Sequence, residues 1–250
     1  MDKFSGFKYQ WFNNNNKHSL LYGDSNRKIA YIMTPRAGCS VSFKFYLDSL
    51  DSTLLEKAIK YNNFIHHYRI EVFDKNIKIV KIEQLIKENY KFIKFVINPF
   101  QRAISSFAII NVKDLDNIKY DMNFQTYYEN LYKNINLHLY SNADLIHTYP
   151  QYLKGEKELN LTIYKLEDKD KELNINGLKI NLKKYSSNHH GNRNIKNNSN
   201  KKLYEIKRRN ILQNLPTKYK LMYNKQSIDY VQNYYKDDII DYKYSINDDF

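Results

Sequence analysis

The segment from Arg27 to Ser42, RKIAYIMTPRAGCSVS, constrains the fold of this chain more than any other stretch. It begins with a short apolar run prone to β structure, Lys28 to Met33, which is long enough for one central strand of a parallel sheet. The run stops at Pro35, and an amphipathic segment with apolar residues at helical spacing follows from Val41 to Leu50. The segment therefore predicts a buried strand that runs into a short turn and then a helix.

The predicted turn combines one cation with small residues. Arg36 is followed by Ala37 and Gly38, and Cys39 and Ser40 open the predicted helix. Free backbone N–H groups and the positive end of a helix dipole meet at such a turn, which favours binding of a phosphate or sulfate. The alternative is a turn that serves only geometry, with a solvated arginine. The chain has no G-x-x-x-x-G-K-[ST] motif, which argues against an ordinary NTPase.

A second segment, Lys91 to Phe107, repeats this order of elements. Its sequence, KFIKFVINPFQRAISSF, predicts a strand from Phe92 to Ile97, a proline turn, and a helix that begins near Arg102 and Ser105. A predicted helix over Ile82 to Asn89 precedes the strand. This βαβ order implies a parallel sheet with a right-handed crossover.

Together the two segments resemble the sulfotransferases that use 3′-phosphoadenosine 5′-phosphosulfate (PAPS), particularly their carbohydrate sulfotransferase branch. Those enzymes carry a 5′-phosphosulfate loop of the form P-[KR]-x-G-x-[ST] after the first strand. They also carry a 3′-phosphate element of the form [FV]-V-R-x-P-[FY]-x-R-x-x-S-x-[YF]. The positions that fit the loop are Pro35, Arg36, Gly38 and Ser40. The positions that fit the 3′-phosphate element are Val96, Pro99, Phe100, Arg102, Ser105 and Phe107.

One position departs from the family pattern. Ile97 stands where the family has the arginine that pairs with the 3′-phosphate of the nucleotide. An isoleucine cannot form that ion pair. Either another cation replaces it, with Arg102 nearest in sequence and Arg193 a second candidate, or affinity for the nucleotide is weakened or lost.

Three further segments are similar to the family in order and spacing. HTYPQ, from His147 to Gln151, resembles the H-x-x-P-Q segment before the fourth strand. Leu161 to Glu167 resembles the strand that ends in Tyr-x-x-Glu, and Ile228 to Tyr244 resembles the terminal helix and its Y-x-x-D-[FI] tail. The resemblance thus covers most of the chain.

The resemblance implies an α/β fold, a P-loop-like three-layer sandwich in which helices flank a central parallel sheet. A length of 250 residues fits one such sulfotransferase-like domain. Residues 1–26 are polar and aromatic, predict no strand, and are expected to be an N-terminal extension. The polar stretch from Lys183 to Asn200 is expected to be a loop, either a surface excursion or a lid over the nucleotide that carries His189 and His190.

The resemblance also implies the chemistry and the residues that perform it. A sulfuryl group would move from PAPS to a hydroxyl or amine of an acceptor, a carbohydrate in this branch, and would leave adenosine 3′,5′-bisphosphate (PAP). No metal is required, because a sulfuryl group carries less charge than a phosphoryl group. Arg36 would stabilise the leaving phosphate, Ser40 would hold the 5′-phosphate and Ser105 the 3′-phosphate. The residues implied to bind the nucleotide are Pro35, Arg36, Ala37, Gly38, Cys39, Ser40, Arg102, Ser105 and Arg193.

Two adjacent histidines are the candidates for the catalytic base. His66 and His67 lie in FIHHYRIEV, residues 64–72, which alternates well enough to predict a strand or a strand plus a turn. Adjacent side chains of a strand point to opposite faces, so at most one of the two could face the site. Glu71 and Glu83 are weaker candidates, and the alternative is that both histidines are ordinary polar residues.

Net charge and composition bound the remaining classes of function. A formal net charge of +13 favours an anionic partner, whether nucleic acid, membrane surface, nucleotide or polysaccharide. No helix-turn-helix, zinc or RNP signature is visible, so a nucleic-acid-binding protein is a weaker alternative. A second alternative is a sulfotransferase fold that has lost activity and binds glycans or other polyanions.

The expected setting follows from cysteine content and hydropathy. The single cysteine excludes an intramolecular disulfide. The sequence shows no 18-residue apolar run and no signal-peptide pattern, so we expect a soluble protein in the cytoplasm or another intracellular compartment.

Overall fold

The computed structural model describes residues 6–13, 16–61, 65–109, 122–140, 145–168, 172–175, 177–185 and 219–248. The chain divides into two compact units. The first consists of Met1–Ile97 and Leu153–Ser187, and the second of Asn98–Tyr152 and Asn188–Phe250. Within the described ranges, no helix has the length and apolar character needed to cross a bilayer.

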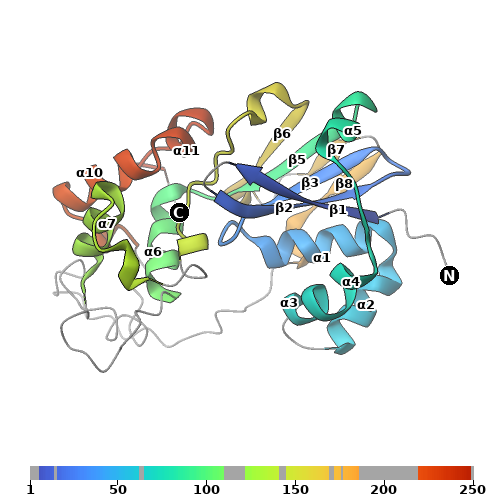
Figure 1. The fold of residues 1–250 in the computed structure, drawn as a ribbon, viewed down its shortest axis with the longest axis horizontal. Helices are drawn as coiled ribbons and strands as arrows, with labels where there is room; N and C mark the ends of the chain where they lie inside the picture. The colour runs from blue at the N-terminus through green and yellow to red at the C-terminus, as the bar shows by residue number, and fades with distance from the viewer. Residues whose placement is uncertain are drawn as a thin grey trace. The chain divides into compact units, whose positions relative to one another are not determined.

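The first unit is built on a mixed sheet with the strand order β4-β1-β2-β3-β5-β6 (Figure 1). Strands β3, β5 and β6 are parallel to one another, whereas β2 is antiparallel to both β1 and β3. The strands are β1 (Gly6–Asn13), β2 (Asn16–Asp24), β3 (Ile29–Met33), β4 (Lys78–Ile79), β5 (Lys91–Val96) and β6 (Leu161–Lys165). Because β3, β5 and β6 are parallel, their carboxyl ends lie at one edge of the sheet.

The two faces of this sheet hold separate hydrophobic clusters. Along β3, Ile29, Tyr31 and Met33 belong to one cluster, and Ala30 and Ile32 belong to the other. The first face is covered by α1 (Cys39–Leu50), α2 (Ser52–Tyr61) and α3 (Ile65–Tyr68), and the second by α5 (Ile82–Lys87) (Figure 1). Every residue of β3 is buried, as the continuous apolar run predicts for a strand covered on both faces.

The α/β class is confirmed, but the sheet is mixed rather than parallel. The difference comes from the β1–β2 hairpin, which occupies residues for which the sequence predicted no strand. Aromatic residues nevertheless recur at every second position in the segment FKYQW, at Phe7, Tyr9 and Trp11. Period-two alternation of aromatic residues is typical of a strand, and this short repeat was missed among the polar residues around it.

The segment that contains the two histidines is helical, so the strand predicted there is wrong. It comprises α3, a π-helical stretch η1 (Arg69–Phe73) and α4 (Asp74–Asn76). Its buried residues are Ile65, Tyr68 and Phe73, which pack in the same cluster as α1 and α2. Their spacing of three and five residues fits a helix, and it overrides the weak alternation of the sequence.

The remaining elements of the first unit are short. They are the hairpin β7 (Leu173–Ile175) and β8 (Leu178–Ile180) and the 3₁₀ segments η4 (Glu156–Glu158), η5 (Leu166–Asp168) and η6 (Leu182–Tyr185). Of the polar stretch predicted to be a loop or lid, only residues 183–185 are described, and they belong to η6. Lys184 in η6 donates to Asp48 of α1 over 2.8 Å.

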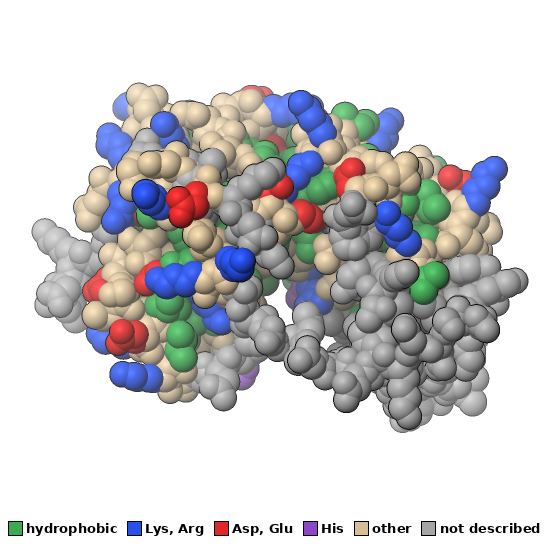
Figure 2. Space-filling model, turned by 180° about the vertical axis from the view of Figure 1, so that it is seen from behind, with side chains coloured by type: hydrophobic (Ala, Val, Ile, Leu, Met, Phe, Trp, Pro, Cys, Tyr) green, Lys and Arg blue, Asp and Glu red, His purple; other side chains and the backbone are tan. Residues whose placement is uncertain are grey.

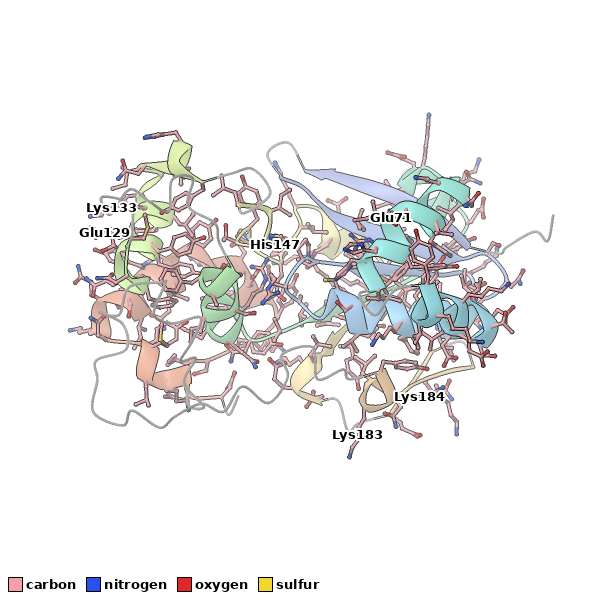
Figure 3. All side chains as sticks on the ribbon, turned by 90° about the horizontal axis from the view of Figure 1, so that it is seen from below. Glu71, Glu129, Lys133, His147, Lys183 and Lys184 are labelled. Atoms are coloured by element: carbon pink, nitrogen blue, oxygen red, sulfur yellow. The ribbon has the colours of Figure 1, made fainter. Side chains whose placement is uncertain are left out.

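The second unit packs helices around an aromatic core. Its helices are α6 (Pro99–Ile109), α7 (Phe124–Lys133), α10 (Lys225–Tyr234) and α11 (Lys236–Asp241), with the 3₁₀ segments η3 (Leu137–Leu139) and η8 (Tyr219–Met222). The core is rich in tyrosine and phenylalanine from α6 and α7, and it also contains Tyr223 directly after η8 and Tyr235 directly after α10. On the surface of α7, Glu129 and Lys133 form an exposed ion pair one turn apart (Figure 3).

A fully buried ion pair crosses from the sheet of the first unit to the chain before β6. Lys94, in β5, is completely buried and donates to the carboxylate of Glu156 in η4. The same carboxylate oxygen accepts the backbone N–H of Leu153 at 2.9 Å. Removal of one partner of such a pair would leave the other charge buried and unpaired.

We predict that Lys94→Met lowers the free energy of unfolding by about 3–5 kcal/mol, because Glu156 loses its counter-charge. The double variant Lys94→Met/Glu156→Gln should recover most of that loss, since a neutral amide oxygen still accepts the Leu153 N–H. Denaturant unfolding of both variants measures the difference. Equal losses in the two variants would mean that the buried charge is not the cause.

Candidate functional site

The turn between β3 and α1 is tight and contains two residues with a left-handed backbone. Thr34 accepts a hydrogen bond from the backbone N–H of Ala37 at 3.1 Å, which closes the turn. Arg36 and Gly38 both have positive φ angles, of 61° and 67°. Successive backbone N–H groups in a turn can form a concave anion-binding site, called a nest, and this turn is a candidate for one.

Helix α1 begins at this turn without a capping side chain. Gly38 occupies the N-cap position and has no side chain to cap the helix, and the first turn holds no acidic residue. The Gly38 carbonyl accepts both the N–H and the hydroxyl of Ser42, at 2.9 and 3.0 Å. The N-cap residue and the first turn of α1 therefore supply neither a capping oxygen nor a negative charge to the N–H groups at the start of the helix.

Gly38 is also in close contact with the chain that follows β6. A Cβ atom at this position would lie 2.3 Å from Cδ1 of Leu166, the first residue of η5. Glycine is thus required for two reasons, the left-handed backbone and the approach of Leu166. Leu166 was not singled out from the sequence, since nothing in an ordinary apolar residue after a strand indicates such a contact.

His66 is the histidine that faces the start of α1. Its Nε2 atom lies 2.8 Å from Oγ of Ser40 and 3.5 Å from Sγ of Cys39. All three side chains are half-buried. The contact brings together a hydroxyl, a thiol and an imidazole from two segments that are 26 residues apart.

His67 points away from that group. Its side chain is 51% exposed, and its Nδ1 atom lies 3.5 Å from Glu71 Oε1. Glu71, labelled in Figure 3, also accepts a hydrogen bond from the hydroxyl of Tyr61 at 2.6 Å. The structure therefore separates the two histidines, because on a helix adjacent side chains point in directions about 100° apart. Glu83 is exposed on α5.

The residues of the 3′-phosphate element begin at the end of β5 and continue into the second unit. Ile97 is half-buried, and Ser105 is half-buried on α6. Arg102 is completely buried; its NH1 atom donates to the Thr148 carbonyl at 3.4 Å, and its guanidinium lies 5.5 Å from the centre of the Tyr235 ring. Arg102 therefore stabilises the core of its own unit. Arg193, like His189 and His190, lies outside the described residues.

Two segments that the resemblance picks out contact each other within the second unit. The buried carboxylate of Asp238, in α11, accepts the backbone N–H groups of Gln151 and Tyr152 at 2.8 and 2.6 Å. Asp238 is the aspartate of the Y-x-x-D tail, and Gln151 ends HTYPQ. In the same segment the carbonyl of His147 accepts a bond from Ser106 of α6 at 2.6 Å, and Figure 3 labels this histidine.

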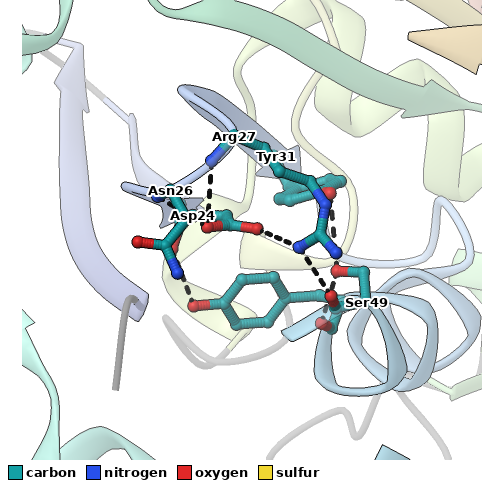
Figure 4. Close-up of polar contacts among 7 residues, drawn as sticks. Asp24, Asn26, Arg27, Tyr31 and Ser49 are labelled. Atoms are coloured by element: carbon teal, nitrogen blue, oxygen red, sulfur yellow. Dashed lines mark hydrogen bonds and ion pairs between the residues drawn. The ribbon is translucent and has the colours of Figure 1, made fainter. Parts of the chain in front are cut away.

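A buried aspartate, Asp24, stabilises the turn between β2 and β3, and it was not identified from the sequence. Asp24 is completely buried and accepts the N–H of Asn26 at 2.9 Å and the guanidinium of Arg27 at 2.5 Å (Figure 4). Arg27 also donates to the carbonyl of Ser49 in α1 at 2.8 Å. The signal for this turn is present in the sequence DSNR, since aspartate at the first position of a turn often accepts the N–H two residues later.

A scan of protein-family models, a search of curated proteins and a search of solved structures each found no match to this chain.

We predict that Gly38→Ala destabilises the first unit more than Gly155→Ala does. Both glycines have positive φ, of 67° and 87°, but a Cβ at Gly155 would meet nothing within 4 Å. The backbone strain of about 1–2 kcal/mol should be common to both variants, and the contact with Leu166 should add about 1–3 kcal/mol to the first. Denaturant unfolding gives both values, and equal losses would show that Leu166 moves aside without cost.

Proposed function

We propose that this chain is a PAPS-dependent sulfotransferase that moves a sulfuryl group to a hydroxyl or amine of an acceptor, with a carbohydrate as the acceptor class. The proposal includes a P-loop-like arrangement of β3, the turn and α1. The observation that carries it is the uncapped N-terminus of α1 after a turn with two positive φ angles, with Ser40 and His66 in contact beside it. The match of Pro35, Arg36, Gly38 and Ser40 to the 5′-phosphosulfate loop supports the same conclusion.

Two features of the turn suit a phosphosulfate. The N–H groups at the start of α1 can donate to the oxygens of the 5′-phosphate, and the helix dipole stabilises their negative charge. Arg36 lies three residues before the first residue of α1, and its guanidinium can bind two oxygens at once. Preorganised donors of this kind lower the barrier when charge develops on the leaving phosphate.

His66 is the proposed base. In the transfer, the acceptor oxygen bonds to sulfur as the bond between sulfur and the bridging phosphate oxygen breaks, and the acceptor loses its proton. The imidazole Nε2 of His66 lies within hydrogen-bond distance of Ser40, the residue proposed to hold the 5′-phosphate. A neutral imidazole in this position can take the acceptor's proton and become an imidazolium, which further stabilises the leaving group.

A second candidate function is a sulfotransferase-like protein that binds glycans or other polyanions without transferring sulfate. Two observations favour it: Ile97 replaces the arginine expected to pair with the 3′-phosphate, and Arg102 is completely buried. A thermal-shift titration with PAP separates the candidates. A rise in melting temperature supports a working nucleotide site, whereas no rise at millimolar PAP favours the second candidate.

The face drawn in Figure 2 gives nucleic-acid binding little support. On the face drawn in Figure 2, lysine and arginine side chains are spread among acidic and neutral ones over the described residues and do not gather in one stripe. Electrostatic binding to a nucleic acid backbone typically uses a clustered basic surface. The charge of +13 is equally compatible with an anionic nucleotide or an anionic glycan.

We predict that the wild-type chain transfers label from ³⁵S-PAPS to one member of a panel of glycans, small alcohols and amines, and that Arg36→Ala lowers the rate by about 10²–10³-fold. The exposed Lys60→Ala, which removes one positive charge from α2, is the control and should retain the wild-type rate. An unchanged rate in Arg36→Ala would remove the turn from the mechanism.

The two histidines give a further prediction. His66→Ala should lower kcat by about 10²–10⁴-fold, because it removes the proposed base, while His67→Ala should have little effect. Steady-state kinetics at saturating PAPS measures both. A large loss of kcat in His67→Ala, with His66→Ala unaffected, would reverse the assignment.

A further inference from the structure

His66 places a titratable ring against the start of α1. Its Nε2 atom lies 2.8 Å from Oγ of Ser40 and 3.5 Å from Sγ of Cys39, and these two residues open the helix. The N–H groups of the first residues of a helix have no acceptor within the helix itself. Gly38 and the first turn of α1 add neither a capping oxygen nor an acidic side chain. The imidazole therefore lies at the end of α1 where an anion would bind.

The charge of an imidazole changes within the ordinary range of pH. A histidine side chain is typically half-protonated near pH 6.5, at about its ordinary pKa. The neutral ring adds no net charge to the helix N-terminus. The protonated ring adds a full positive charge to the partial positive charge of the helix dipole, and both of its nitrogens become donors. An anion at the start of α1 should therefore be held more tightly when the ring is protonated.

The helices that pack against the segment of His66 contribute few competing changes of charge. On α1, the thiol of Cys39 contacts the ring, and a thiol ordinarily titrates near pH 8.5, well above an imidazole. The other charged residues of α1, Lys44 and Asp48, lie at least one turn beyond Ser40. The charged side chains of α2 are exposed to solvent, at Glu56, Lys57 and Lys60.

The charged groups of the segment itself are also accounted for. His67 is 51% exposed and lies 3.5 Å from Glu71. The carboxylate of Asp74 accepts a tyrosine hydroxyl at 2.9 Å. Arg69, like Arg36 in the turn before α1, is an arginine and keeps its charge throughout the ordinary range of pH. His67 is thus the second histidine of the segment and provides the control for the test below.

Anion binding and protonation of His66 should favour each other. We propose that His66 takes up a proton when an anion binds the start of α1, so that the protonated ring strengthens binding and loss of the proton weakens it. An opposite charge within about 4–6 Å favours the charged form of a titratable group. Because linked equilibria are reciprocal, the protonated ring must favour the bound anion by the same factor.

A consequence for catalysis rests on the proposed function, in which the same ring accepts the proton of the acceptor. After sulfuryl transfer the ring is positive and stabilises the bound PAP. Loss of that proton to solvent then weakens the binding of PAP and promotes its release. At low pH the site should bind the nucleotide well, but His66 is already protonated and cannot act as a base.

The test is the pH dependence of sulfate binding, measured by calorimetry without PAPS and at constant ionic strength. Sulfate remains a dianion from about pH 5.5 to pH 7.5, a range below the ordinary titration of a thiol. Wild-type protein should bind sulfate at least about fivefold more tightly at the lower pH, which corresponds to a rise of about one unit in the imidazole pKa on binding.

Two glutamine variants assign the effect to one ring. His66→Gln should bind sulfate with nearly the same affinity across this range, because the amide keeps a polar group beside Ser40 but cannot gain a charge. His67→Gln is the matched control and should keep the wild-type pH dependence. An equal pH dependence in His66→Gln and wild type would overturn the inference, as would a wild-type affinity for sulfate that is constant or undetectable.

Should His66→Gln fail to fold, the assigned ring signals of His66 in NMR spectra of the wild type decide. A higher imidazole pKa in the presence of sulfate supports the inference, and an unchanged pKa overturns it. If the linkage is observed but no label moves from PAPS to any acceptor, the inference stands and the proposed sulfuryl transfer fails. If label moves but the affinity for sulfate does not depend on pH, the transfer stands and the inference fails.

Discussion

The first unit depends on the burial of β3 between two hydrophobic clusters. Each residue of this strand is buried, and its neighbours are β2 on one side and β5 on the other. With the strand fixed on both edges and both faces, the chain can leave the sheet at only one point, and the turn at Thr34 to Gly38 forms there. The left-handed backbone of Arg36, which is strained for a residue with a side chain, persists because the structure on either side holds it.

Local electrostatics explain why this turn is suited to an anion. Among the described helices, α7 and α10 are capped by the side chains of Asn123 and Asn224, whereas the N-cap residues of α1, α5 and α11 make no side-chain capping bond. Helix α1 has a glycine in that position, which gives the backbone its left-handed turn but offers no oxygen to the free N–H groups.

Much of the site could be predicted from the sequence because it lies in one continuous stretch. The run KIAYIM, the proline and the small residues after it place strand, turn and helix in order, and the structure has them at these positions. His66 was a candidate, but its contact with Ser40 joins segments far apart in the chain, and no local pattern indicates such a contact. The helical form of its segment depends on burial of Ile65, Tyr68 and Phe73 against α1 and α2, which overrides local alternation.

The pairing of Lys94 with Glu156 could not be predicted from the sequence either, because the two residues lie far apart in the chain. A lysine in the middle of an apolar strand is expected to face solvent. Lys94 is instead completely buried, and its partner Glu156 is 62 residues away in the chain. The hairpin β1–β2 was missed because its alternation is short and lies among asparagines. In each case the deciding partner is distant in the chain, and tertiary packing rather than local preference determines the outcome.

The location of the single cysteine has a practical consequence. Cys39 is the first residue of α1, half-buried, and in contact with His66. A thiol-directed fluorophore would therefore attach at one known place, beside the very N–H groups that an anion would occupy. The unaltered chain thus carries its own attachment point for an optical reporter of ligand binding, without the need to engineer one.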